Sequence, residues 1–305
     1  MKILVAGATG VLGVRAIPAM VKAGHDVIGV ARSPGKRAVL ERLGATAIEV
    51  DLFDAAAVHR AVRDVDVIIN LATSVPSGFR VVFPWAWNAM SRIRREVSRN
   101  LVDAALAAPT VQRLIQESFA PVYAAAGDRW IDESFPVRPA RYNRSVLDAE
   151  GNADRFTQSG RPAVTLRFGL LYGAGDALTR QMIDSVRRGW FPMFGRSESY
   201  SSWIAQDDAA AAVVAALGVP AGTYNVVESE PMRRRDLADG IARLLGTSPP
   251  RFLPSWATPF GGAVGPTLAR SLRISNRKLR GASDWVPRYP TTLEGLASII
   301  TGIDG

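Results

Sequence analysis

The chain has 305 residues, of which 48% are hydrophobic and 21% are charged, a composition typical of globular proteins and not of disordered, collagen-like or coiled-coil chains. It contains no cysteine and only two histidines, so disulfides, thiolate zinc sites and a cysteine nucleophile are excluded and no metal site is expected. The net charge of +9 is spread along the chain. Its short arginine clusters are interpreted as solvated helix faces, so no nucleic-acid partner is expected.

The chain shows no segment typical of membrane insertion or secretion. No apolar stretch reaches the roughly 18 residues that cross a bilayer, and the apolar run at 3–6 is too short for a signal peptide. We therefore expect a cytoplasmic protein without a membrane partner.

Strands alternate with helices through the first half of the sequence. The predicted strands are residues 2–6, 26–31, 46–50 and 65–71, and the predicted helices are residues 14–23, 35–43 and 55–62. Apolar strands that alternate with helices are typical of a parallel sheet covered on both faces. With right-handed crossovers, this pattern predicts an α/β fold with a doubly wound sheet.

The second half of the sequence is less regular. The predicted elements are helices at 91–108, 145–158 and 234–245, strands at 111–116 and 163–167, and loops at 173–176 and 249–266. We expect a smaller C-terminal lobe that packs on the sheet without a sharp boundary.

A glycine-rich turn is the strongest local motif. Residues 7–13, Gly-Ala-Thr-Gly-Val-Leu-Gly, follow the first strand and open the first helix. Glycines allow a tight turn and close approach to a pyrophosphate, and the helix N-terminus offers free N–H groups. A structural turn is the alternative, but the strand–turn–helix context favours dinucleotide binding. The predicted contacts are Gly7, Thr9, Gly10, Val11, Leu12 and Gly13.

Basic side chains follow the second strand, where an acidic residue would bind the ribose 2′-hydroxyl of NAD. Arg32 stands at this position and Lys36 follows it. A guanidinium matches a 2′-phosphate in charge and geometry, so NADP(H) is predicted in preference to NAD(H). The alternative is that Arg32 only faces solvent.

Two further segments are expected beside the cofactor because they follow the third and fourth strands. Asp51 and Leu52 follow the third strand, where a carboxylate can accept a hydrogen bond from the adenine amino group. Asp51 could equally be the N-cap of the helix that begins near Ala55. The segment after the fourth strand contributes Leu71, Ala72 and Thr73.

The order of these motifs resembles the extended short-chain dehydrogenase/reductase superfamily, in particular its NAD(P)-dependent epimerase/dehydratase-like branch. Beyond the segments already named, the similar ones are residues 167–173, 203–209, 222–226, 284–287 and 293–296. The resemblance covers nearly the whole chain. It implies a Rossmann-type cofactor domain at residues 1–170 and a smaller α+β substrate lobe mainly at residues 171–305, with the segment around 203–227 returning to the cofactor domain.

The family's hydride chemistry uses a Tyr-x-x-x-Lys pair, which the resemblance carries over only in part. Tyr142 matches the tyrosine that serves as general acid/base, but Val146 stands where the lysine would lower its pKa and hold the nicotinamide ribose. Without that lysine, the pKa of Tyr142 is expected near 10, which makes it a poor base at neutral pH. Of the neighbouring arginines, Arg141 is the better candidate to supply the missing charge.

The family's catalytic serine or threonine is also replaced. Counting back from Tyr123 places Phe119 at that position, and Ser118 is its neighbour. Neighbouring strand residues point to opposite faces, although a bend at the strand end would let Ser118 reach the substrate. Tyr142 and Ser118 are therefore the candidate catalytic residues.

Aromatic residues gather in segments expected near the reactive end of the cofactor. Core packing is the alternative, but several stand among proline and glycine in loops, where pocket walls are often built. We predict a substrate with apolar or aromatic surface. The candidate pocket residues are Trp85, Trp87, Phe119, Tyr172, Phe194 and Trp203.

Together, these features predict an NAD(P)-dependent oxidoreductase or epimerase that acts on a carbonyl or carbinol of a small organic substrate. A cofactor-sensing regulator without catalysis and a non-redox dehydratase or cyclase on the same fold are the alternatives. The resemblance also implies a homodimer in which helices 91–108 and 145–158 of two subunits form a four-helix interface. The sequence does not identify the substrate or the reaction direction.

Overall fold

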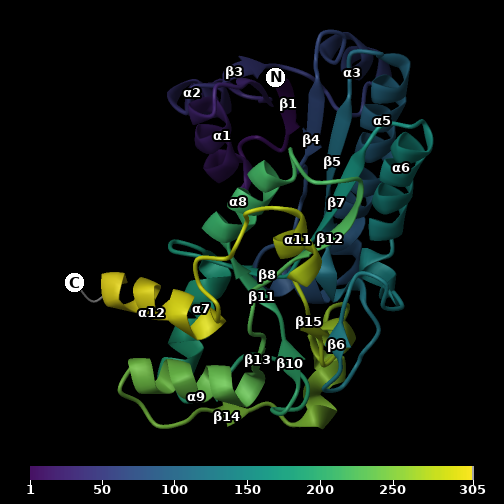
Figure 1. Cartoon of the computed structure of the whole chain (residues 1–305). Helices are drawn as coiled ribbons and strands as arrows, with labels where there is room; N and C mark the ends of the chain where they lie inside the picture. The colour runs from purple at the N-terminus through teal and green to yellow at the C-terminus, as the bar shows by residue number, and fades with distance from the viewer. Residues whose placement is uncertain (304–305) are drawn as a thin grey trace.

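The computed structural model describes residues 1–303, without the side chains of residues 255, 302 and 303. At its centre is a seven-stranded parallel sheet with the strand order β12-β7-β5-β4-β1-β2-β3 (Figure 1). The strands are β1 (Lys2–Ala6), β2 (Asp26–Val30), β3 (Thr46–Ile48), β4 (Val67–Asn70), β5 (Arg113–Phe119), β7 (Ala163–Phe168) and β12 (Gly222–Val226). The predicted doubly wound sheet is thereby confirmed, and the strand order reverses between β1 and β4.

Helices cover both faces of the sheet (Figure 1). Because successive strand residues point to opposite faces, Ile3 and Val5 join one apolar core and Leu4 and Ala6 join the other. The first core lies under α1 and α8, and the second lies under α3, α5 and α6. The helices are α1 (Gly13–Lys22), α2 (Pro34–Arg42), α3 (Ala55–Ala61), α5 (Ser98–Ala107), α6 (Val146–Gln158) and α8 (Gln206–Ala215).

The helix predicted at 91–108 is interrupted by a π turn. It consists of α4 (Asn88–Arg92), a π-helical segment η3 (Ile93–Val97) and α5. A π turn is wider than an α turn and often lies at a functional site. Here it buries the side chains of Arg94 and Val97.

A smaller lobe occupies the C-terminal part of the chain and lies below the sheet in Figure 1. Its helices α7 (Ala177–Arg187), α9 (Arg234–Leu244) and α12 (Thr292–Ile303) enclose a core of its own. Its short strands form four pairs: β8 (Leu170–Tyr172) with β11 (Trp203–Ala205), β9 (Trp190–Phe191) with β14 (Arg251–Phe252), β10 (Tyr200–Ser201) with β13 (Met232–Arg233), and β15 (Arg273–Ile274) with β6 (Trp130–Ile131). None of the described helices is long and apolar enough to cross a membrane.

The prediction of a loop over residues 249–266 is wrong. This segment contains β14, the 3₁₀ segment η6 (Ser255–Gly261) and the start of α10 (Gly265–Leu268). Several of its prolines and glycines lie at the beginnings and ends of short helical turns. Pro266, for example, lies in the first turn of α10. A further helix, α11 (Arg277–Ala282), follows β15.

Arg234 links two loops of the lobe through hydrogen bonds to their backbone carbonyl groups. Its guanidinium is buried and donates hydrogen bonds to the carbonyl oxygens of Phe194, Leu268 and Arg270 at 2.6–2.7 Å. No carboxylate pairs with it among the described ion pairs. Burial lowers its pKa to about 10.

Candidate active site

A cleft opens at the carboxyl edge of the sheet, where the strand order reverses between β1 and β4. Ligands of doubly wound sheets bind in such a crevice. The lining residues are Gly7, Thr9, Gly10, Val30, Arg32, Lys36, Asp51, Leu52, Phe53, Leu71, Ala72, Thr73, Ile93 and Val97. Every residue expected beside the cofactor therefore lines the cleft, except Val11, Leu12 and Gly13 at the start of α1.

The sequence analysis missed four of the lining residues. Val30 and Phe53 are next to predicted contacts, and their position could have indicated them. Ile93 and Val97 come from the π turn, which only the tertiary fold brings to this edge.

The glycine turn has the shape that a pyrophosphate requires. Gly7 has a φ of +76°, and a Cβ there would lie 2.4 Å from the carbonyl oxygen of Leu71. A Cβ on Gly13 would lie 2.4 Å from the carbonyl oxygen of Ala8. A Cβ on Gly10 would meet only the carbonyl oxygen of Gly7, at 3.1 Å, so the chain leaves space above this residue. The turn thus fits the phosphates of a dinucleotide.

Arg32 and Lys36 stand exposed at the rim of the cleft, and no ion pair among the described residues engages either side chain. Their charges are therefore available to an anionic ligand.

Asp51 is not the N-cap of α3. Its carboxylate accepts a hydrogen bond from the backbone N–H of Phe53 at 3.0 Å. The cap is Asp54, which accepts from Ala56 and Ala57. Asp51 consequently lines the cleft with one carboxylate oxygen engaged in a local turn.

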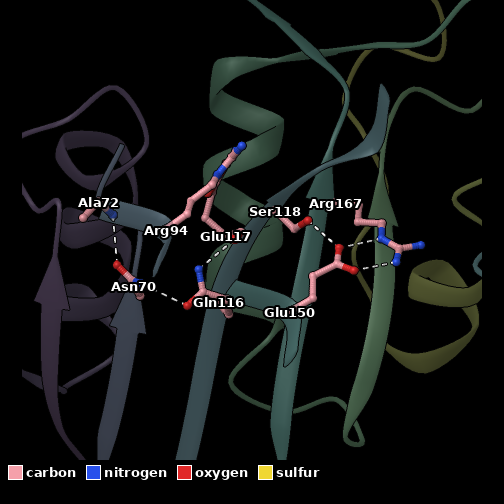
Figure 2. Close-up of polar contacts among 8 residues, drawn as sticks. All are labelled: Asn70, Ala72, Arg94, Gln116, Glu117, Ser118, Glu150 and Arg167. Atoms are coloured by element: carbon pink, nitrogen blue, oxygen red, sulfur yellow. Dashed lines mark hydrogen bonds and ion pairs between the residues drawn. The ribbon is translucent and has the colours of Figure 1, made fainter. Parts of the chain in front are cut away.

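Polar side chains fix the strand ends beside the cleft (Figure 2). Asn70 donates to Gln116 on the neighbouring strand at 2.9 Å and accepts from the N–H of Ala72 at 3.2 Å. These bonds hold the backbone of the segment that follows β4 and lines the cleft.

Ser118 is fully buried on the face of β5 that packs on α6. Its hydroxyl donates to the Glu150 carboxylate at 2.5 Å, and Arg167 binds both oxygens of that carboxylate at 2.7 and 2.8 Å (Figure 2). Arg167 also donates to the hydroxyl of Tyr123. The bend that Ser118 would need in order to face the substrate does not occur, because Ser118 remains within the strand and its hydroxyl is held by Glu150.

Tyr142 lies buried in the 3₁₀ turn η5 (Arg141–Asn143). Its ring packs on Trp87, with ring centroids 4.5 Å apart. Burial raises its pKa, while the Thr267 hydroxyl and the charges of Arg94 and Arg270 act in the opposite direction. The phenol is therefore neutral and is a hydrogen-bond donor at neutral pH.

The two residues expected at the positions of the family's lysine and hydroxyl lie in one apolar cluster. Val146 is fully buried in it, and Phe119 packs against it. The surface at these two positions is therefore apolar.

A buried ion pair stands at the end of β5. Arg94, from the π turn, donates to Glu117 of β5 at 3.0 Å, and both side chains are drawn in Figure 2. Arg141 is exposed, so the charges that act on Tyr142 come from Arg94 and Arg270 instead. Sequence proximity gave no signal for either residue, since both are brought in by the tertiary fold.

The structure does not bring the six predicted pocket residues together. Trp87 packs on Tyr142, and Phe119 lies beside Val146. Tyr172 and Trp203 belong instead to the core of the C-terminal lobe, because the β8–β11 pair packs against α12. The other two lie elsewhere: Phe194 is in a loop and approaches Gly261, and Trp85 is in a short 3₁₀ helix, where it is exposed and stacked on Phe83.

The fold and the cleft define a dinucleotide-binding α/β protein. The model of the NAD dependent epimerase/dehydratase family matches residues 3–226, and the chain belongs to this family. It is thus an enzyme of the oxidoreductase and epimerase type.

Curated relatives include two reductases. A 3-diazoavenalumate denitrifying reductase from Streptomyces sp is 31% identical over 97% of this chain and 99% of its own length. A 2-alkyl-3-oxoalkanoate reductase from Shewanella oneidensis is 25% identical over 90% of this chain and 73% of its own length.

Among solved structures, UDP-glucuronic acid 4-epimerase from Bacillus cereus, in complex with UDP-glucuronic acid and NAD, aligns with a TM-score of 0.76. The alignment covers 99% of this chain and 100% of the epimerase at 20% identity, a likeness that establishes the fold.

Proposed function

We propose that this chain is an NADPH-dependent reductase. The observation that carries the cofactor preference is the pair Arg32 and Lys36, which line the cleft after β2 without an acidic partner. A 2′-phosphate would bind both cations, whereas the 2′-hydroxyl of NAD would leave them unused. NAD(H) remains the weaker alternative.

The chain's own groups account for binding and orientation of the cofactor. The glycine turn and the N-terminus of α1 would hold the pyrophosphate, and Asp51 would lie beside the adenine. Leu71, Ala72 and Thr73 would flank the nicotinamide half. When bound, the cofactor would supply the hydride.

The substrate in this proposal is a small, partly apolar organic compound with a carbonyl group. Support comes from Tyr142, whose buried neutral phenol can donate a hydrogen bond to a carbonyl oxygen, and from the adjoining ring of Trp87. We do not retain Ser118 as catalytic, because Glu150 holds its hydroxyl away from the cleft.

A second substrate class, aryl diazo compounds, is favoured by a specific combination of observations. A curated relative carries the name 3-diazoavenalumate denitrifying reductase. The resemblance, moreover, places the apolar residues Val146 and Phe119 at the positions of the lysine and hydroxyl of the proton-transfer set. Replacement of dinitrogen on an aryldiazonium ion by hydride balances in charge and electrons: a bond to hydrogen forms, the carbon–nitrogen bond breaks, and neutral N₂ leaves. This reaction needs no proton donor.

Calorimetric titration with NADPH and NADH tests the cofactor proposal. We expect Arg32→Ala to weaken NADPH binding by about tenfold or more and to leave NADH binding unchanged. Arg42→Ala, which changes another exposed arginine of the same segment, is the matched control. Equal affinities of the wild type for the two nucleotides would contradict the preference.

Turnover of an aryl ketone and of an aryldiazonium salt, followed through NADPH oxidation, separates the two substrate classes. Tyr142→Phe is expected to lower ketone reduction by about a hundredfold and to spare diazonium reduction. Failure of both substrates with protein that binds NADPH would contradict the substrate assignment.

We also propose that residues 1–170, with the segment around 203–227, form the cofactor domain, and that the rest of 171–305 forms the substrate lobe. A homodimer built through α5 and α6 is proposed as well. It is supported by the packing of these helices side by side and by the exposed Leu147 on α6. Light scattering is expected to give a dimer mass, and a monomer mass would contradict it.

A further inference from the structure

A second, much smaller pocket lies next to Tyr142, between the end of β5 and the loops of the C-terminal lobe. Its volume is about 20 Å³, and its lining includes Pro121, Ser202, Thr267 and Arg270. The described lining residues include the cations of Arg234 and Arg270 and no acidic side chain. A pocket of about 10–15 Å³ already holds a water molecule, so this one admits the oxygens of a small group and excludes a sugar ring.

Arg270 carries a positive charge that no carboxylate of the described chain neutralises. It is half-buried, and its guanidinium donates to the carbonyl oxygen of Tyr123 at 2.9 Å. Burial lowers its pKa, Tyr142 acts in the opposite direction, and the nearby charge of Arg138 lowers it further. Two like charges held close together favour a bound anion between or beside them.

Thr267 adds an unused hydrogen-bonding group to the same pocket. Its side chain is 1% exposed, and its hydroxyl oxygen has no partner in normal hydrogen-bond geometry, although the Tyr142 phenol lies close enough to interact with it. Buried hydroxyls in native proteins normally have partners, and an unsatisfied one at a pocket indicates a ligand or a bound water.

Arg234 contributes charge to this pocket but few free donors. Its guanidinium is already engaged by three close carbonyl oxygens, which fix its position under the pocket. The pocket therefore combines a fixed buried cation with a freer one, Arg270, whose charge lies near that of the exposed Arg138 outside the pocket lining.

We propose that Arg270, Thr267 and Arg138 form a subsite for the carboxylate of an aromatic acid, whose ring lies beside Trp87. The ring of Trp87 packs on Tyr142 at a tilted angle, and Thr267 and Arg270 both act on the Tyr142 phenol, so an aromatic ring and a carboxylate would be held on two sides of one phenol. This inference rests on the proposed reductase function and names its substrate class.

The test is calorimetric binding of trans-cinnamate and of its neutral isostere trans-cinnamamide to protein saturated with NADPH. We expect cinnamate to bind about tenfold more tightly, or more, than the amide. Arg270→Gln should remove this preference, and Arg138→Gln, at the exposed position outside the lining, should reduce it by about threefold. Arg270→Lys, which keeps the charge, should retain part of it.

Arg243→Gln is the matched control, since Arg243 is an exposed arginine near the end of α9. Equal binding of acid and amide, no binding of cinnamate up to about 10 mM, or an unchanged preference in Arg270→Gln would overturn the subsite. Tighter binding of inorganic phosphate than of cinnamate would also overturn it, because the site would then select phosphate.

NADPH binding is measured in every preparation. A failure of the protein to bind NADPH is therefore distinguished from a failure of the carboxylate subsite. If Arg270→Gln does not fold, the variant Arg138→Gln and the comparison of acid with amide in the wild type still decide the question.

Discussion

The cofactor cleft and the surroundings of Tyr142 are built in different ways. The cleft is made by four consecutive strand–helix connections, each of which reaches the same edge of the sheet, with the π turn closing one side. The surroundings of Tyr142 are made by long side chains from segments far apart in the sequence: Trp87, Arg94, Thr267 and Arg270. A site of the first kind depends mainly on the course of the backbone, while a site of the second kind depends on side chains that only the tertiary fold brings together.

The largest expected effect comes from the buried pair that supports β5. Glu150→Ala leaves Arg167 as an uncompensated buried charge, so the free energy of unfolding should fall by about 3–5 kcal/mol. Asp103→Ala, which breaks the exposed pair with Arg155, should cost less than about 1 kcal/mol. Urea denaturation measures both. Similar losses in the two variants would refute a supporting role for Glu150.

The glycine turn tests whether the cleft depends on backbone shape. Gly7→Ala should lower the free energy of unfolding by about 3 kcal/mol, because its φ is +76° and the new Cβ would collide with Leu71. Gly10→Ala should cost less than about 1 kcal/mol and still weaken NADPH binding by about tenfold, since its methyl group fills the space left for phosphate. Equal stability of the two variants would argue against this division of roles.

Ser118→Ala distinguishes a supporting from a catalytic hydroxyl. Loss of the hydrogen bond to Glu150 should lower stability by about 1–2 kcal/mol and leave kcat within about twofold of the wild type. Ser134→Ala, at an exposed serine, serves as control. A hundredfold fall in kcat of Ser118→Ala would instead indicate that the Ser118 hydroxyl takes part in catalysis.

The smallest effect is expected from pH. Because burial raises the pKa of Tyr142 above its usual value near 10, the phenol keeps its proton through the neutral range. The kcat for ketone reduction should therefore stay flat between roughly pH 6 and pH 9 and fall at higher pH as the donor is lost. A fall in kcat centred near pH 7 would show that Tyr142 has the depressed pKa of a lysine-assisted tyrosine.

The sequence was sufficient for the sheet and for most of the cleft, because both depend on local signals. Strand–helix alternation and the glycine turn are encoded over a few residues, and the carboxyl ends of adjacent parallel strands necessarily meet at one edge. Arg94 and Arg270 carry no such signal, since a buried arginine looks like a surface arginine in sequence. Tyr172 and Trp203 were misassigned for the converse reason, as a core aromatic residue and a pocket aromatic residue have the same composition and similar neighbours.

The π turn between α4 and α5 sets the rotational phase of two helix faces. Before it, Met90 packs toward Tyr142, and after it, Leu101 packs into the core under the sheet. One residue corresponds to about 100° of rotation in an α-helix, so deletion of the exposed Arg95 would turn Arg94 away from Glu117 while α5 stayed in place. A change of one residue in length at this turn would thus redirect the charge of Arg94 and the face that carries Met90, while α5 kept its packing under the sheet.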